Sequence, residues 1–285
     1  MSNAIEIRGL TKEYDDFKLD NIDITLPKGY IMGFIGENGA GKTTTIKAML
    51  DLINIDGGQI SILGETFDAN RRQSSALREH VGVVLDHAGL PDSASAEDAE
   101  RIMRSCYSTW DSTAFRGYME KFGLPAKKKV KDYSRGMKMK LCIAIALSHG
   151  CKLLILDEAT SGLDPVVRDE ILDIFREFIQ DEEHSVFISS HILSDLEKIC
   201  DYITFIHEGR IIFSESKDEL LEKYGILKCS EDELEAIESS AVIAYKKNEF
   251  GIEALVEREK VNPSFIIDDA GIEDIMIYFT REGRR

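Results

Sequence analysis

Residues 36–43 read Gly-Glu-Asn-Gly-Ala-Gly-Lys-Thr, which matches the phosphate-loop pattern GxxxxGK followed by Ser or Thr at every position. The glycines let successive backbone N–H groups turn inward onto phosphate oxygens without a Cβ in the way. We expect Lys42 to neutralise charge on the β- and γ-phosphates and the Thr43 hydroxyl to ligate Mg²⁺, while the following helix adds its dipole. This stretch therefore predicts a site for a nucleoside triphosphate and Mg²⁺.

The residues around the loop have the structural pattern that such a loop requires. Residues 30–35 form a continuous apolar run typical of a strand buried on both faces. Ile46, Met49 and Leu50 then follow the loop with helical spacing. This strand–loop–helix order argues against a chance glycine-rich loop.

A second apolar strand ends in two acidic residues. Residues 153–156 are Leu-Leu-Ile-Leu, and Asp157 and Glu158 follow directly. Open α/β sheets bind ligands at the carboxyl ends of their strands, so we expect Asp157 to hold Mg²⁺ or its water. Glu158 is expected to face the γ-phosphate and act as general base on the attacking water. Alone, these acids could be a solvated strand end; behind a phosphate loop they predict hydrolysis.

Composition and charge exclude several classes of protein. The 285 residues include 43% apolar and 31% charged residues, the balance of a folded chain, with 35 Lys+Arg against 52 Asp+Glu and a net charge of −17. That charge disfavours nucleic acid as a partner. The longest apolar run, residues 141–147, is far too short to span a membrane, and the N-terminus lacks the pattern of a signal peptide. Five cysteines without a CxxC pair indicate reduced thiols in the cytosol.

Strand and helix patterns alternate along most of the chain and predict an α/β fold with a mainly parallel sheet. Residues 5–26 indicate β-structure, and helix formers dominate a predicted insertion at about 88–150, with helices near 96–105, 114–122 and 137–147. A hairpin is expected at 202–213. We expect one domain over 1–215 and an appendage over 216–285, which carries 17 acidic and 10 basic residues. The appendage is expected to be helical near 218–238 and mixed α/β later.

Three further motifs make the chain resemble the nucleotide-binding subunit of ABC transporters. Residues 133–138, Tyr-Ser-Arg-Gly-Met-Lys, are similar to that family's signature, Leu-Ser-Gly-Gly-Gln. Residues 161–164 match the family's D-loop, and residues 189–191 match its switch histidine. Together with the two nucleotide motifs, they cover about residues 5–215 in the family's order. The resemblance implies a P-loop NTPase core with an N-terminal antiparallel β subdomain, a helical subdomain, and Mg-dependent ATP hydrolysis.

The resemblance also implies roles for single residues. Tyr14 would stack on adenine, although it could be an ordinary exposed tyrosine near a turn. His191 would bond the γ-phosphate and hold the attacking water, although a lone histidine after a strand is often structural. Ser134 and Gly136 would contact ATP held by the other subunit of a head-to-tail dimer. The predicted catalytic residues are Glu158 and His191; the metal ligands are Thr43, Asp86 and Asp157; the nucleotide-binding residues are Tyr14, Gly36, Glu37, Asn38, Gly39, Ala40, Gly41, Lys42, Thr43, Thr44, Ser134, Gly136 and Asp164, the last of which would couple the two sites.

Two residues depart from the family's pattern. Asp86 stands where the family has a glutamine that ligates Mg²⁺. Some bacterial exporters for self-protection against peptide antibiotics are similar in carrying an acid there, and neutral drift is the alternative. Arg135 replaces the first signature glycine, a variant common among ABC-2 exporter ATPases. It leaves open the geometry of the signature loop.

The sequence thus predicts the ATP-hydrolysing motor subunit of a bacterial ABC exporter. It would act as an ATP-sandwich dimer with a second copy of itself or a paralogue. It would drive a separate membrane permease from the cytoplasmic face of the membrane. The alternative is a soluble non-transport ABC ATPase, which the single phosphate loop and the net charge disfavour. The appendage resembles the short extension of many ABC-2 ATPases, with a capping or dimer-stabilising helix around residues 272–279.

Overall fold

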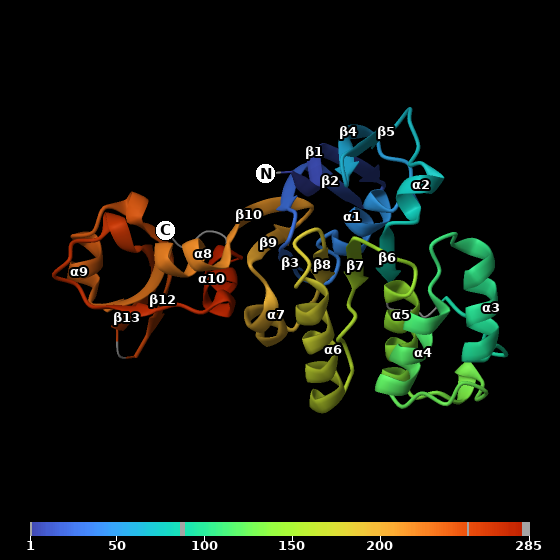
Figure 1. Ribbon diagram of the computed structural model, residues 1–285. Coiled ribbons are helices and arrows are strands. Elements are labelled where there is room, and N and C mark those ends of the chain that lie inside the picture. The colour runs from blue at the N-terminus through green and yellow to red at the C-terminus, as the bar shows by residue number, and fades with distance from the viewer. Residues whose placement is uncertain (1, 86–88, 250, 281–285) are drawn as a thin grey trace. The chain divides into compact units, whose positions relative to one another are not determined.

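The computed structural model describes residues 2–85, 89–249 and 251–280 (Figure 1). The chain divides into two compact units, Met1–Ile211 and Ile212–Arg285. The division falls within strand β10 (Arg210–Ser216), close to residue 215, where the sequence predicts the end of the first domain. The first unit holds two sheets and most of the helices, and the second holds a small sheet with helices of its own.

The first sheet is antiparallel, with strand order β2-β1-β4-β5. It forms because apolar residues alternate along β1 and β2, so that one face is buried: Ile7 lies opposite Ile24 on one side and Ile60 on the other. All three are buried. The strands are β1 (Asn3–Tyr14), β2 (Phe17–Pro27), β4 (Gly57–Ile62) and β5 (Glu65–Asp68).

The second sheet carries the predicted motifs and has the strand order β10-β9-β3-β8-β7-β6. Neighbouring strands from β9 to β6 run parallel. Every residue of β3, β7 and β8 is buried, which explains why these strands read as unbroken apolar or small-residue runs rather than as alternating patterns. The strands are β3 (Ile31–Ile35), β6 (Val81–Val84), β7 (Leu153–Asp157), β8 (Ser185–Ser189), β9 (Tyr202–His207) and β10.

The predicted helical insertion is confirmed as three helices that stand together in Figure 1 and share an apolar cluster around Phe115, Leu141 and Ala144. Each begins after a polar N-cap side chain: Ser95, Asp111 and Ser134 accept hydrogen bonds from the first turns. These helices are α3 (Ala96–Cys106), α4 (Ser112–Lys121) and α5 (Arg135–Leu147), with a 3₁₀ turn at Val130–Asp132. The first unit also contains α1 (Lys42–Met49), α2 (Ser75–Arg78), α6 (Pro165–Phe178) and α7 (Leu193–Ile199).

The prediction of a continuous helix near 218–238 in the second unit is wrong. Strand β11 (Tyr224–Cys229) interrupts it and pairs antiparallel with both β13 and β14, in the sheet order β12-β13-β11-β14. Sheet pairing overrides the helix-forming neighbours of this segment, and Ser230 then caps a separate short helix through a reciprocal capping box with Glu233. The elements are α8 (Lys217–Lys223), α9 (Glu231–Glu235), β12 (Val242–Asn248), β13 (Gly251–Glu257), β14 (Ile267–Asp269) and α10 (Ile272–Phe279), with 3₁₀ turns at Ser239–Ala241 and Arg258–Lys260.

The last helix buries one face within the second unit. Ile272, Ile275 and Tyr278 are buried, and the Phe279 ring packs edge-on against Phe213 and Tyr224 at 5.5 Å between ring centroids. Helix α10 therefore closes the core of this unit.

Candidate nucleotide-binding and hydrolytic site

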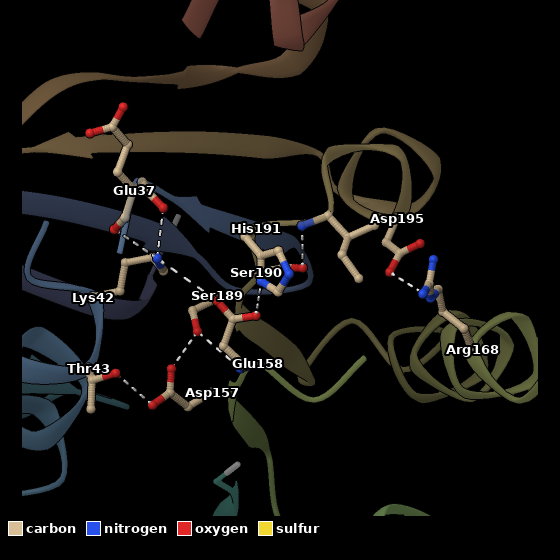
Figure 2. Close-up of polar contacts among 12 residues, drawn as sticks. Glu37, Lys42, Thr43, Asp157, Glu158, Arg168, Ser189, Ser190, His191 and Asp195 are labelled. Carbon is tan, nitrogen blue, oxygen red and sulfur yellow. Dashed lines mark hydrogen bonds and ion pairs between the residues drawn. The ribbon is translucent and has the colours of Figure 1, made fainter. Parts of the chain in front are cut away.

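Three adjacent parallel strands bring the site together at their carboxyl ends. The phosphate loop follows β3, Asp157 ends β7, and Ser189 ends β8, which lies between the other two. In register, Ser189 lies beside Phe34 of β3 and beside Asp157 of β7. Segments more than 100 residues apart in the chain are thus held at one edge of one sheet, as Figure 2 shows.

The phosphate loop is an open cradle that ends at a helix N-terminus. Gly41 is the N-cap of α1 with a φ of 116°, and a Cβ there would lie 2.5 Å from Leu19 Cδ2. Gly39 also has a positive φ, of 86°, but a Cβ built on it would meet nothing within 4 Å. The loop thus requires glycine for its backbone shape and leaves free space above it, where the N–H groups of the helix N-terminus can receive an anion.

Lys42 is a buried cation inside this loop. Its ammonium donates hydrogen bonds to the carbonyls of Gly36 at 2.7 Å and Glu37 at 3.2 Å, and it lies 3.9 Å from Glu158 Oε1. Burial lowers the pKa of the ammonium below its ordinary value, and the carboxylates of Glu158 and Asp157 oppose that shift. The cation is therefore held where phosphate oxygens can replace part of its lost hydration.

Thr43 and Asp157 form the candidate metal site. The Thr43 hydroxyl donates to Asp157 Oδ2 at 3.0 Å, and the hydroxyl of buried Ser189 donates to Asp157 Oδ1 at 2.6 Å. Hydroxyl and carboxylate oxygens are the donors that Mg²⁺ prefers. In the described part of the chain, no cluster of three or more His, Cys, Asp and Glu side chains could hold a metal ion. A Mg²⁺ ion here would take its remaining ligands from phosphate oxygens and water.

Glu158 and His191 are directly hydrogen-bonded. Glu158 Oε2 accepts from His191 Nδ1 at 2.6 Å, and the Glu158 carboxylate is mostly buried whereas His191 is half exposed. The backbone of Glu158 is left-handed, with a φ of 54°, a strained state for a residue with a side chain. Its N–H is anchored by the carbonyl of Ser189 at 3.1 Å and by the Ser189 hydroxyl at 3.2 Å.

The two ring nitrogens of His191 have different partners. The Nδ1 proton is used in the bond to Glu158, which leaves Nε2 for a second partner. Nε2 can donate to a phosphate oxygen only when it also carries a proton.

An aromatic residue that sequence reasoning missed lies beside the loop. Phe17, the first residue of β2, lines a hollow together with Asp16, Lys18, Glu37, Asn38, Gly39 and Ala40. Its ring is close enough that a Cβ at Gly41 would lie 2.9 Å from Phe17 Cζ. Tyr14 is 46% exposed at the end of β1, with the Lys12 ammonium 5.3 Å from its ring centroid. The predicted stacking of Tyr14 on adenine stays a prediction, and Phe17 is a second candidate for it.

The predicted signature and D-loop segments meet each other within the chain. A Cβ at Gly136 would lie 3.3 Å from Val167 on α6, and one at Gly162 would lie 2.4 Å from Arg135 Nη1. Arg135, which departs from the family's glycine, therefore lays its guanidinium over a residue that has no side chain. Ser134 and Asp164 are the N-caps of α5 and α6, accepting from Met137 N at 3.2 Å and Val167 N at 3.1 Å.

Comparison with known proteins decides the family. The profile of the ABC transporter family matches residues 19–161. The chain belongs to the ABC transporter family. It is 38% identical over 215 residues to the bacitracin transport ATP-binding protein BcrA of Bacillus licheniformis, covering 74% of this chain and 69% of that protein. It is also 38% identical over 217 residues to the lantibiotic transport ATP-binding protein SrtF of Streptococcus pyogenes, covering 75% and 91%.

Solved structures agree with this assignment. A structure described as the ATP-binding subunit of an ABC transporter matches with a TM-score of 0.67 and 25% identity, covering 76% of this chain and 91% of that one. An ATP-binding cassette solved as a dimer with ADP and phosphate matches with a TM-score of 0.65 and 18% identity, which shows a shared fold. The predicted family and fold class are confirmed, and this ABC ATPase is the ATP-binding subunit of a transporter.

The structure leaves some predicted roles in this ABC ATPase as predictions. Asp86 lies outside the described residues. Contacts of Ser134, Gly136 and Asp164 with the ATP of another subunit need that subunit and stay predictions. Among the described residues, no helix is long and apolar enough to cross a membrane.

Replacing Ser189 by alanine should weaken the metal site. The change removes the 2.6 Å hydrogen bond to Asp157, and a hydrogen bond to a charged group contributes about 1.5–3 kcal/mol. We expect the Mg²⁺ concentration for half-maximal ATPase activity to rise about tenfold, since such an energy corresponds to roughly that factor or more. Ser190→Ala is the matched control, because Ser190 is equally buried and its hydroxyl accepts from the Ile192 N–H instead of touching Asp157. An unchanged Mg²⁺ titration in Ser189→Ala would contradict this role.

Removing the Phe17 ring should weaken nucleotide binding more than removing the Tyr14 ring. Base–aromatic stacking contributes about 1–3 kcal/mol, so Phe17→Ala should raise the dissociation constant for ATP by roughly tenfold. The measurement is calorimetric titration of ATP into each variant without Mg²⁺, so that no turnover occurs. A larger loss in Tyr14→Ala would instead assign the adenine contact to Tyr14.

Proposed function

We propose that this ABC ATPase powers the export of a peptide antibiotic or a similar compound through a separate membrane permease. The two relatives at 38% identity are named for bacitracin and lantibiotic transport, which supports this substrate class and direction. The observation that carries the catalytic part is the meeting of Lys42, Asp157, Glu158 and His191 at the ends of adjacent strands, with Glu158 and His191 2.6 Å apart.

Each of these residues has a distinct task in ATP hydrolysis. The loop N–H groups and Lys42 bind the β- and γ-phosphates. Thr43 and Asp157 would hold Mg²⁺, which supplies charge neutralisation on the phosphates when bound. Glu158 accepts the proton of the attacking water, and the hydrogen bond from His191 fixes the direction of its carboxylate.

The working unit in this proposal is a head-to-tail dimer with two ATP molecules at the interface. Ser134 and Gly136 of one subunit contact the γ-phosphate bound to the other. Both stand at the N-terminus of the 13-residue helix α5, whose dipole favours an anion. ATP binding closes the dimer and hydrolysis opens it. The partner is a second copy of this chain or a paralogue.

A groove of the first unit is the proposed docking place of the permease. It is lined in part by Leu85, Leu90, Tyr133 and Met139, between the end of β6 and helix α5. Apolar and aromatic side chains in a groove suit the insertion of a helix from another protein. The ABC ATPase would thus work at the cytoplasmic face of the membrane, and its permease would supply the membrane-spanning part.

Glu158→Gln should bind ATP normally and hydrolyse it slowly. General base catalysis contributes typically 10²–10⁴-fold, so we expect turnover to fall at least 100-fold. Phosphate release measures turnover, and size-exclusion chromatography with ATP should show the variant trapped as a dimer. Glu182→Gln, at an exposed position, is the matched control. Undiminished turnover in Glu158→Gln would remove the assignment of the base.

The partner can be tested directly by purification from membranes. An affinity-tagged chain expressed at native level should bring down one integral membrane protein, which mass spectrometry identifies. Recovery of soluble partners alone would contradict a transport role and favour a non-transport ABC ATPase.

A further inference from the structure

A buried ion pair joins helices α6 and α7 and has no role in the proposed mechanism. Asp195, in the first turn of α7, is 1% exposed, and its Oδ2 lies 3.6 Å from Arg168 Nε on α6 (Figure 2). Within the described part of the chain, neither of these two atoms has a hydrogen-bond partner. The buried charge of Asp195 is therefore balanced chiefly by Arg168.

The two residues connect segments that matter for hydrolysis. Asp195 lies four residues after His191, whose ring bonds Glu158. Arg168 also donates from Nη2 to the carbonyl of Leu163 at 3.1 Å, and Leu163 belongs to the D-loop, residues 161–164. The guanidinium of Arg168 thus donates a hydrogen bond to the D-loop backbone and forms an ion pair with α7, the helix that follows His191.

The D-loop is bounded on its other side by the catalytic glutamate. Ser161, the first residue of the D-loop, donates from its backbone N to the carbonyl of Glu158 at 3.0 Å, and the loop ends at Asp164, the N-cap of α6. Arg168 follows that cap by one turn of the helix. A displacement of the D-loop would therefore move Glu158 through the backbone that joins them. It would move His191 through the Arg168–Asp195 ion pair.

Helix α7 needs such an anchor. It has seven residues, and its N-cap position, Ile192, supplies no side-chain hydrogen bond. A short helix without a cap is weakly fixed by itself. Leu196 and Ile199 bury the apolar side of the helix, and Arg176 on α6 donates to the Lys198 carbonyl at 3.4 Å near its end. Asp195 is the buried contact with α6 in the first turn, the part of the helix nearest in the chain to His191.

Stability alone does not explain this pair. Removing charges from water is costly, and well-packed apolar residues in place of a buried ion pair are often neutral or stabilising. A pair of apolar residues would fill the same space but could not bond the Leu163 carbonyl.

We propose that Arg168 and Asp195 are positioning residues that make the D-loop and the switch histidine move together. Contact of the partner subunit with the D-loop then sets the Glu158–His191 pair in its hydrolytic geometry. This inference rests on the proposed function, because it takes the D-loop to lie at the dimer interface.

The test compares Asp195→Asn with the double variant Arg168→Met/Asp195→Leu in the full chain. Asp195→Asn keeps the shape of the side chain and removes its charge; the double variant replaces the pair by apolar groups of similar size. Steady-state ATPase assays give kcat and KM, and thermal melting reports folding. We expect kcat to fall about tenfold in both variants with KM within twofold of wild type, and the double variant to melt as wild type does. Arg101→Met is the matched control, since Arg101 forms an exposed ion pair with Asp98 within helix α3, away from α6 and α7.

Two readouts separate coupling from a structural role. In the Glu158→Gln background, the double variant should still dimerise with ATP, because the pair acts after the subunits meet. A double variant with the kcat and the melting temperature of wild type would overturn the proposal. An unchanged kcat in a folded Asp195→Asn would overturn it as well. A wild-type chain that neither hydrolyses ATP nor dimerises would instead refute the proposed function itself.

Discussion

The site depends on the register of strand β8, which lies between β3 and β7 in the parallel sheet. Ser189 is aligned with Phe34 on one side and with Asp157 on the other, and its hydroxyl reaches the Asp157 carboxylate at 2.6 Å. A shift of one residue would turn the buried side chains of the strand to the opposite face and move His191 away from Glu158. The pairing of β8 with a strand on each side and the close packing of its buried side chains hold this register.

The same strand anchors the strained backbone of Glu158. Glu158 has a left-handed backbone, which costs on the order of 1–3 kcal/mol for a residue with a side chain. Two hydrogen bonds from its N–H to Ser189 offset this cost. The strain has a use, because it turns the chain sharply at the end of β7. The carboxylate can then lie near both Lys42 and His191.

The sequence was sufficient for those parts of the site that are local in the chain. The phosphate loop is eight consecutive residues whose glycines, lysine and threonine each have a chemical reason, and Asp157 and Glu158 simply end an apolar strand. The helical insertion was also predictable, because its helices carry their own spacing and caps. The expected helix at 218–238 was wrong because Tyr224–Cys229 gains more from pairing with two other strands than from continuing a helix.

Contacts between distant segments could not be predicted in the same way. The bond of Ser189 to Asp157 joins residues 32 positions apart through strand register, and the Arg168–Asp195 pair joins two helices through packing. No spacing rule signals either of them. The ring of Phe17 was missed for a similar reason: its approach to the phosphate loop depends on how β2 packs over that loop, while the local pattern singled out Tyr14.

We propose that this chain hydrolyses ATP with the residues gathered at the ends of β3, β7 and β8. The most direct measurement is phosphate release from ATP by the purified full chain, with Lys42→Ala alongside, since Lys42 is the cation held inside the loop. We expect Mg²⁺-dependent turnover that is lost in Lys42→Ala. Equal turnover in the two proteins, or none in the folded wild type, would contradict it.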